Sequence, residues 1–320
     1  MTAGRKISVA MCTYNGESFL REQLDSLARQ TQVPYELIVC DDGSRDRTFS
    51  VLEDFGRHSE FPVKLIRNRE RLGIVRNFEQ AIRLCEGDLI ALADQDDVWH
   101  PDKLHLVGAT FADPRVVAAF SDAEVVDEAL NRLHYTMWQR TGFHLNEQAC
   151  AANGGALDVF LKHYVVTGAT LVFHADLRPA ILPLPLDWPH DAWIATVAAT
   201  RGRVIPIHAP LVFYRQHAGN QVGGRKKSLI RQVREALNVE RIGYYEREIA
   251  RWNMLKERVD GGAEGGNDKI REKLAHLTRR VQLPATRWKR IPRILVEIRA
   301  GGYRRFARNW GSIAFDLFVK

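Results

Sequence analysis

The fold of this chain is decided by Leu89-Ile90-Ala91-Leu92-Ala93-Asp94-Gln95-Asp96-Asp97-Val98-Trp99-His100-Pro101. A short apolar run fits one buried strand, and it ends abruptly in three carboxylates before Pro101 prevents the strand from continuing. Carboxylates crowded together repel one another and lose hydration, so they persist where a cation lies between them. The stretch indicates either a divalent-metal site at the end of a central strand or a solvated acidic turn.

The chain before this stretch alternates between strand and helix patterns. Strands are expected at residues 6–11, 35–40, 63–66 and 89–93, and helices at residues 17–30, 47–55 and 76–84. This alternation predicts a parallel sheet with helices on its faces. The carboxyl ends of parallel strands lie at one edge, so the polar turns that follow them should converge on one pocket.

The pattern becomes mixed from residue 116 onward. Strands are expected at residues 116–121, 165–173, 203–207 and 211–215, with a helix at residues 189–200 and variable, partly helical connections at residues 130–160. Gly168 would lie at the middle of its strand, where a glycine allows a close backbone approach or a bulge. The later chain predicts helices at residues 228–259 and 269–281, separated by a glycine-rich break at residues 261–266.

Charge divides the chain into two parts. Residues 225–320 hold 24 Lys and Arg against 11 Asp and Glu, a balance of +13, whereas residues 1–224 hold 22 against 28, a balance of −6. The 320 residues suffice for one large domain with an appendage. We therefore expect an α/β domain over residues 1–224, in two halves of about 1–115 and 116–224, followed by a helical, basic region over residues 225–320.

Cysteine use and hydropathy limit the compartment. The four cysteines are widely spaced and form no Cys-x-x-Cys pair, which favours a reducing environment over a disulfide-rich secreted fold. A strand pattern begins at once after Met1, leaving no room for a signal peptide, and no window approaches the roughly 20 apolar residues of a membrane span. The sequence therefore predicts a cytoplasmic protein, with peripheral contact to the inner face of the membrane as a further expectation.

Three polar turns in the first half match the needs of a nucleotide. They are Thr13-Tyr14-Asn15, Asp41-Asp42 and Asp94-Gln95-Asp96-Asp97. Asp42 could accept a hydrogen bond from a pyrimidine imide or a ribose hydroxyl, while Asp94 and Asp96 hold a cation that neutralises a diphosphate.

The motifs, in their order along the chain, resemble the family 2 glycosyltransferases of the GT-A fold. The resemblance covers residues 5–222 and rests on Thr13-Tyr14-Asn15, Asp41-Asp42-Gly43-Ser44, Asn68, Gly73, Arg76-Asn77, Asp94-Gln95-Asp96-Asp97 and Pro101-Asp102-Lys103-Leu104. It implies a mixed, mainly parallel sheet flanked by helices. Two later motifs, His190-Asp191-Ala192-Trp193 and Tyr214 to Gly223, are similar to bacterial enzymes that add rhamnose or related sugars to cell-surface polysaccharide.

The resemblance also assigns roles to individual residues. Asp191 corresponds to the catalytic base, and Asp94, Asp96 and His217 to the ligands of Mg²⁺ or Mn²⁺. The residues expected to bind the nucleotide sugar are Thr13, Tyr14, Asn15, Glu17, Asp42, Arg76, Asp94, Gln95, Gly168 and Arg215.

Each role has a structural alternative. Asp191 could cap its helix, and His217 could be a hydrogen-bonding histidine without a metal. Arg76 and Arg215 could bind phosphate or pair with surface acids. His190 is interpreted only as a neighbour of the base.

The resemblance implies a metal-dependent, inverting glycosyltransferase. Its donor would be dTDP-rhamnose or, alternatively, a UDP- or GDP-sugar. Its acceptor would be a lipid-linked cell-surface glycan, because the resemblance implies membrane-borne acceptors. A sugar nucleotidyltransferase is disfavoured because residues 8–16 lack a glycine-rich, arginine-containing phosphate loop. A non-catalytic nucleotide-sugar-binding or scaffolding protein is the alternative of another class.

The basic C-terminal region has three interpretations. It could bind anionic lipid, it could attract nucleic acid, or its helices could pack on the first domain or on a second subunit of a homo-oligomer. The membrane interpretation is favoured because the family resemblance implies membrane-borne acceptors.

Overall fold

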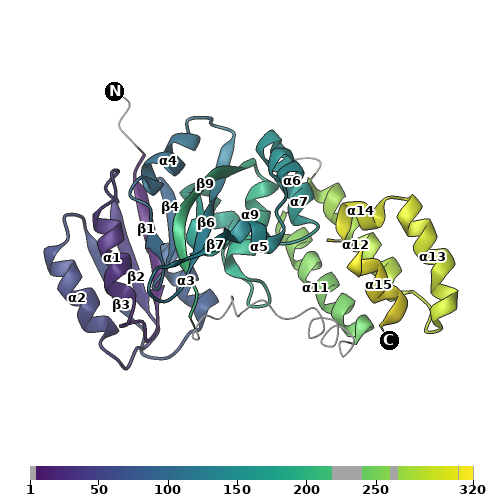
Figure 1. Cartoon of the computed structure of the whole chain (residues 1–320), viewed down its shortest axis with the longest axis horizontal. Coiled ribbons are helices and arrows are strands. Elements are labelled where there is room, and N and C mark those ends of the chain that lie inside the picture. The colour runs from purple at the N-terminus through teal and green to yellow at the C-terminus, as the bar shows by residue number, and fades with distance from the viewer. Residues whose placement is uncertain (1–4, 218–239, 260–265, 309, 320) are drawn as a thin grey trace. The chain divides into compact units, whose positions relative to one another are not determined.

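The computed structural model describes residues 5–217, 240–259, 266–308 and 310–319. The chain forms two compact units. The larger unit holds residues 1–156 and 165–217, and the C-terminal unit holds residues 157–164 and 218–320. Figure 1 labels the elements of both.

A nine-stranded sheet forms the centre of the larger unit. Its strands are β1 (Ile7–Thr13), β2 (Glu36–Asp41), β3 (Val63–Arg67), β4 (Leu89–Asp94), β5 (Val98–Trp99), β6 (Val116–Val126), β7 (Arg132–Thr136), β8 (Leu171–His174) and β9 (Arg203–Arg215). Their order is β3-β2-β1-β4-β8-β6-β9-β5, and β7 pairs with β6. The first four strands along the order are parallel, as is the pair β6–β9, while β8, β5 and β7 pair antiparallel to their neighbours. The predicted mixed, mainly parallel sheet is confirmed.

Helices cover this sheet. They are α1 (Leu20–Ala28), α2 (Thr48–His58), α3 (Ile74–Leu84), α4 (Lys103–Thr110), α5 (Met137–Thr141), α6 (Leu145–Cys150), α8 (Arg178–Ile181) and α9 (His190–Ala199). Helix α7 (Ala156–Phe160) falls almost entirely in the C-terminal unit. Figure 1 shows α1 and α2 beside the parallel strands β1 to β3. The strands β1, β2 and β4 are apolar runs buried on both faces, as expected where helices cover a parallel sheet.

The register brings the polar turns together. Cys12 of β1 lies opposite Asp94 of β4, and Thr13 lies opposite Asp41 of β2. The turns after these three strands therefore leave the sheet at one edge, as the sequence predicted.

Three predicted strands differ from the structure. Residues 165–173 do not form one strand, because Gly168–Thr170 make a 3₁₀ turn, closed by Thr170 N–H donating to Thr167 O at 2.9 Å, before β8 begins. The two late strands are one strand, β9, whose pairing with β6 shifts register around Pro210. Proline removes a ladder donor, and here it produces an irregular register rather than the end of the strand.

The C-terminal unit is helical where it is described. It contains α11 (Arg241–Val259), α12 (Gly266–Val281), α13 (Arg287–Arg299), α14 (Gly302–Phe306) and α15 (Gly311–Phe318). Residues 228–239 of the predicted long helix and residues 261–265 of the predicted break lie outside the described residues. No helix among the described residues is both long enough and apolar enough to cross a membrane.

Candidate active site

The loop after β1 is held by side chains from the neighbouring turns. Tyr14 N–H donates to Gln95 Oε1 at 2.8 Å, and Gln95 Nε2 donates back to Tyr14 O at 3.2 Å. Asn15 has a φ of 47°, a left-handed conformation that Asn tolerates, and its N–H donates to Ser44 Oγ at 2.9 Å. Gln95 is the middle residue of the Asp-x-Asp turn. It therefore fixes the loop that we predicted to lie beside the nucleotide.

Gly16 is required by this arrangement. A Cβ built on Gly16 would lie 2.2 Å from Gln95 Oε1, so any larger residue would displace the Gln95 side chain. Glu17, a predicted donor-binding residue, instead accepts a hydrogen bond from Arg47 N–H at 2.7 Å and is partly exposed. This contact places Glu17 at the rim between the first two turns.

Asp41 and Asp42 have different surroundings. Asp41 is fully buried and accepts hydrogen bonds from Thr13 Oγ1 and from the backbone and hydroxyl of Ser44. Asp42 is also buried, and its carboxylate accepts from Asn68 Nδ2 at 3.0 Å. Asp41 therefore shapes the turn.

Asp42 also fixes the segment that precedes α3. Its two carboxylate oxygens accept from Leu72 N–H at 2.7 Å and from Gly73 N–H at 2.9 Å. The neighbouring Arg71 guanidinium stacks on the Tyr14 ring at 3.9 Å. The carboxylate that was predicted to bind the base is thus bonded to Asn68 and to the segment before α3, and Tyr14 is linked to this segment through Arg71.

Asp94 ends β4 in a strongly acidic environment. Burial raises the pKa of Asp94, and the charges of Asp96 and then Asp191 add to this effect against the opposing charge of Lys103, so that the pKa is about 7. The Gly168–Thr170 turn contacts β4 and also lies against Asp191, so this turn connects the predicted base to the strand that ends in Asp94.

The predicted metal ligands fit a divalent cation in part. His217 Nε2 lies 2.7 Å from Asp96 Oδ2, so an imidazole nitrogen and a carboxylate oxygen are already adjacent. Asp94 supplies the excess negative charge nearby that a cation would relieve. Among the residues that the structure describes, no three His, Cys, Asp or Glu side chains are arranged as a metal cluster. The chemistry of the donors nonetheless suits Mg²⁺ or Mn²⁺.

The structure brings Gly168, His190 and Asp191 together, although His190 was interpreted from the sequence only as a neighbour of the base. A Cβ on Gly168 would lie 3.1 Å from His190 Nε2 and 3.6 Å from Asp191 Oδ2. Asp191 lies in the first turn of α9, and its Oδ1 accepts from Ala192 N–H at 2.8 Å. His190 stacks on Phe78 with ring centroids 4.2 Å apart, and burial lowers its pKa. His190 is therefore a neutral wall of the space in front of Asp191.

Arg76 and Arg215 differ in burial. Arg76 is half-exposed on α3 and donates to Glu79 Oε2 at 2.7 Å. Arg215 is only 1% exposed, and its Nε donates to Asp96 O at 2.7 Å. Its terminal nitrogens donate to the carbonyl of Glu128 and to the carboxylate of Glu22. The buried Arg215 guanidinium thus anchors the acidic turn through the carbonyl of Asp96.

Lys103 is a residue of the site to which the sequence analysis assigned no role. Its side chain is fully buried, lies 3.1 Å from the centroid of the Trp99 ring and donates to Ala169 O at 2.6 Å. Burial lowers its pKa, and the charges of Asp97 and Asp94 oppose that shift. The signal available in the sequence was a lysine two residues after Pro101, a position that ordinarily belongs to an exposed first helical turn.

Comparisons with known proteins agree with this geometry. Residues 8–160 match the family model described as glycosyl transferase family 2. The dTDP-rhamnosyl transferase RfbG of Shigella flexneri is 27% identical over 259 residues, which cover 75% of this chain and 82% of RfbG. WfgD of Escherichia coli, a UDP-Glc:alpha-D-GlcNAc-diphosphoundecaprenol beta-1,3-glucosyltransferase, is 30% identical over 122 residues, 38% of this chain and 47% of WfgD. The match to EpsE of Bacillus subtilis, 35% identical, spans 37% of that protein and 32% of this chain.

Solved structures support the fold. Staphylococcus aureus TarS 1-349 in complex with UDP-GlcNAc has a TM-score of 0.58 at 16% identity, covering 90% of this chain and 79% of that one. The mannosyltransferase PcManGT of Pyrobaculum calidifontis, in complex with GDP-Man and Mn²⁺, has a TM-score of 0.57 at 19% identity, covering 94% and 77%. With the strand order, the converging turns and the matched family model, these findings confirm the family prediction. Residues 8–160 belong to glycosyl transferase family 2, and the larger unit has the GT-A fold.

Proposed function

We propose that this glycosyltransferase moves a sugar, with inversion, from a nucleotide diphosphate donor to a hydroxyl group of a bacterial cell-surface glycan. The donor we favour is dTDP-rhamnose, because RfbG, which matches three quarters of the chain, is named as a dTDP-rhamnosyl transferase. UDP- and GDP-sugars are the alternatives, since TarS and PcManGT are structures with UDP-GlcNAc and GDP-Man. The name of WfgD supports a lipid-linked acceptor.

The observation that carries the proposal is the convergence of Asp191 on the acidic turn. Asp94 ends a parallel strand, Asp96 lies against His217, and the Gly168–Thr170 turn that contacts β4 also lies against Asp191. A transferase needs both a place for the departing diphosphate and a base on the acceptor side. This edge of the sheet provides candidates for both.

The donor side is built from the first two turns and the metal ligands. Asp42 would accept hydrogen bonds from the base or the ribose, and Tyr14, fixed by Gln95, would lie beside the nucleotide. Asp94, Asp96 and His217 would hold Mg²⁺ or Mn²⁺. When bound, such a cation neutralises the charge that develops on the departing diphosphate.

The acceptor side is built around Asp191. As the acceptor oxygen bonds to the anomeric carbon, the bond between that carbon and the diphosphate oxygen breaks. The acceptor proton passes to the Asp191 carboxylate. Gly168 leaves room in front of this carboxylate, where a Cβ would approach His190 and Asp191.

Two measurements test the proposal. Calorimetric titration with dTDP, UDP and GDP, each with and without Mn²⁺ or Mg²⁺, should show one nucleotide binding tightly only with metal. The variant Asp191→Asn should then lose transfer by about 10²- to 10⁴-fold while nucleotide affinity stays within a factor of about three. The matched control is Asp187→Asn, an exposed carboxylate just before α9, which should retain wild-type transfer.

Three outcomes would contradict parts of the proposal. Transfer that survives in Asp191→Asn would remove the base assignment, and metal-independent binding would remove the metal assignment. Nucleotide binding without turnover on any sugar donor would instead favour the non-catalytic alternative.

A further inference from the structure

Helix α13 of the C-terminal unit has apolar side chains on two faces: Ile294 and Ile298 pack in the core of the unit, and a second set is exposed. The side that faces the rest of the unit carries Arg290, Ile294 and Glu297, all of which are buried. The opposite side carries Trp288, Pro292, Leu295 and Val296, at the i, i+4, i+7 and i+8 spacing of one helical stripe. A surface helix ordinarily buries the apolar stripe and exposes the charges.

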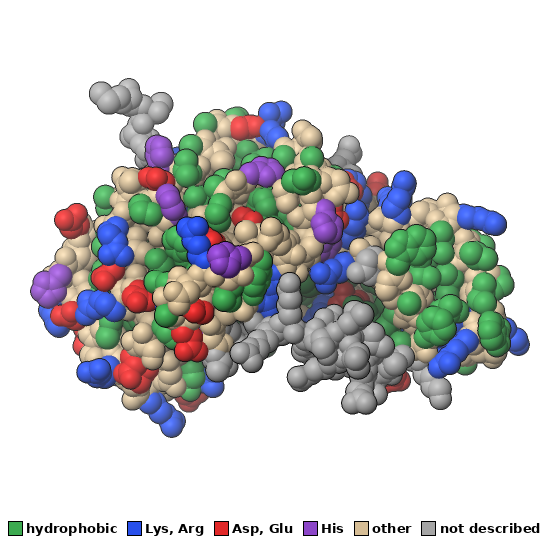
Figure 2. Space-filling view, viewed as in Figure 1, with side chains coloured by type: hydrophobic (Ala, Val, Ile, Leu, Met, Phe, Trp, Pro, Cys, Tyr) green, Lys and Arg blue, Asp and Glu red, His purple; other side chains and the backbone are tan. Residues whose placement is uncertain are grey.

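The exposed stripe is large. Trp288 is 79% exposed, Val296 is 64% exposed and Leu295 is 46% exposed. On the face drawn in Figure 2, hydrophobic side chains gather over the C-terminal helices, with Lys and Arg at their edges. Exposed apolar side chains that gather in one patch commonly mark a site of interaction with a partner or a membrane.

The inward charges of α13 fix the rotation of the helix. The Arg290 guanidinium donates to four carbonyls, those of Pro284, Ala285, Asp316 and Val319. Glu297 accepts two hydrogen bonds from Arg279, at 2.6 and 2.9 Å, and lies 2.5 Å from His276. Because these groups are satisfied only in this orientation, the apolar stripe cannot turn inward.

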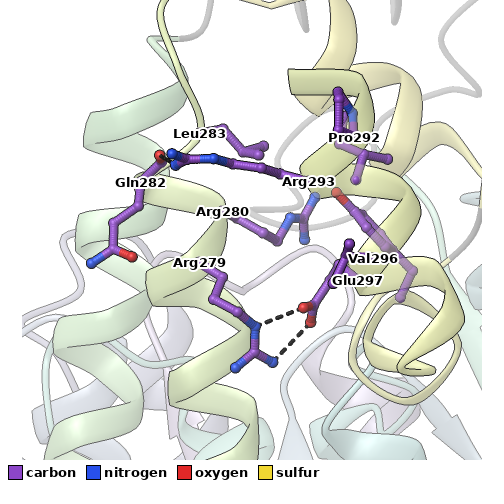
Figure 3. A pocket seen from close by; sticks show the side chains of 10 residues that line it. Arg279, Arg280, Gln282, Leu283, Pro292, Arg293, Val296 and Glu297 are labelled. Carbon is purple, nitrogen blue, oxygen red and sulfur yellow. Dashed lines mark hydrogen bonds and ion pairs between the residues drawn. The ribbon is translucent and has the colours of Figure 1, made fainter. Parts of the chain in front are cut away.

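The C-terminal unit contains a cavity beside the same helix. It measures about 280 Å³ and lies between the end of α12 and α13 (Figure 3). Pro292, Arg293 and Val296 contribute to its lining, together with Leu283 and Ile294. Arg279 of the lining is bonded to Glu297, as Figure 3 shows, so it adds no free charge.

The charge around the stripe has one sign. Arg287, Lys289, Arg293 and Arg299 are exposed on α13, whereas its acid, Glu297, is buried and paired. Within the described part of the chain, Arg287, Lys289 and Arg299 have no acidic partner at ion-pair distance. An occupant of this surface must therefore offer both apolar contact and negative charge.

We propose that the outward face of α13 is a peripheral docking surface for an anionic lipid bilayer. Trp288, Leu295 and Val296 enter the boundary between headgroups and acyl chains, and the flanking cations contact lipid phosphates. Trp288 is suited to this depth because an indole combines an apolar ring with a polar N–H. The proposal goes beyond the transfer reaction and does not depend on it.

The test is sedimentation of the full chain with vesicles of phosphatidylcholine and phosphatidylglycerol in equal parts. Wild-type protein should sediment with these vesicles and remain in solution with vesicles of phosphatidylcholine alone. The variant Lys289→Gln/Arg293→Gln/Arg299→Gln should bind on the order of 100-fold more weakly, because each cation near such a surface contributes a factor of roughly five.

A second variant tests the apolar part. Trp288→Ser/Val296→Ser should bind roughly 10-fold or more weakly, since it removes most of the apolar area that would leave water. The control Leu145→Ser changes an equally exposed residue of the larger unit, 78% exposed, and should bind as the wild type does. Thermal unfolding of every variant should match the wild type, because the changed side chains are exposed.

Several results would overturn the proposal. They are failure of the wild type to bind the anionic vesicles, equal binding to the neutral vesicles, or wild-type binding by both α13 variants. A wild-type dimer in analytical ultracentrifugation that Trp288→Ser/Val296→Ser converts to a monomer would assign the face to a second copy instead. Nucleotide titration without vesicles reports on the proposed reaction separately, so the two proposals can fail independently.

Discussion

Replacing Arg215 tests whether a buried cation anchors the acidic turn through its backbone. Arg215 closes β9, and its guanidinium joins the carbonyls of Asp96 and Glu128 to the carboxylate of Glu22. It also packs over the Phe19 ring, with Cζ 4.6 Å from the centroid. Arg215→Met keeps an unbranched apolar chain of similar length beside that ring and removes all three guanidinium contacts.

The expected loss of stability follows from these contacts. Each carbonyl that loses a charged donor costs about 1.5 kcal/mol at the lower end of the range for such bonds. The pair with Glu22 adds less than about 1 kcal/mol, because the Glu22 side chain is 52% exposed and solvent screens it. The sum is about 3 to 4 kcal/mol, which for a unit of this size lowers the unfolding midpoint by about 10 °C.

The assay is scanning calorimetry of the full chain, which follows the transition of the larger unit. The matched control is Arg21→Met, since Arg21 also forms an ion pair, 2.8 Å from Asp54, but both side chains are about half exposed. The control should shift the midpoint by no more than about 3 °C. If Arg215→Met changed the midpoint no more than this control, burial of the guanidinium would not anchor the turn.

Three further variants test the candidate site. Gln95→Ala should raise the Kd for the nucleotide about tenfold in calorimetric titration, because it releases both backbone contacts of Tyr14; an unchanged Kd would show that the loop does not need this support. Asp96→Asn should weaken Mn²⁺-dependent nucleotide binding by about 10- to 100-fold while leaving any metal-independent binding intact, and equal loss with and without metal would contradict the ligand role. Gly168→Ala should lower kcat more than it raises the nucleotide Kd, because its methyl would meet His190 at 3.1 Å on the acceptor side; a selective loss of nucleotide affinity would place Gly168 on the donor side instead.

The donor half of the site was predictable from the sequence because it depends on local patterns. Each strand is an apolar run that ends in polar residues, and parallel pairing carries those ends to one edge. The observed register, with Cys12 opposite Asp94 and Thr13 opposite Asp41, is the physical outcome of that rule. The roles of the individual residues in binding remain predictions.

The contacts within the site were less predictable because they join residues far apart in sequence. Nothing near Gln95 indicates that its amide will bond to both backbone groups of Tyr14. Gly168 was expected inside a strand, since its neighbours are β-branched and apolar, whereas the packing of α9 against it requires a turn. Tertiary contacts overrode the local β preference there.

The C-terminal unit shows a different limit of sequence reasoning. A basic, aromatic segment is compatible with lipid, nucleic acid or packing, and composition alone does not separate them. The structure adds the orientation of α13, in which Arg290 and Glu297 face inward and Trp288 faces solvent. That orientation depends on carbonyls at residues 284, 285, 316 and 319, which a helical pattern does not reveal.

The acidic turn and the base are connected through one buried side chain. Lys103 is the cation that opposes the raised pKa of Asp94, and its Nζ donates to the carbonyl of Ala169, the residue after Gly168. Gly168 in turn lies against Asp191. A group that binds at the acidic turn therefore acts on the same lysine that positions the segment in front of the base. Since the lysine is fully buried, where charges are screened little, a change of charge on the donor side should be felt on the acceptor side. This link gives a physical reason why the donor and acceptor halves of the site should be coupled.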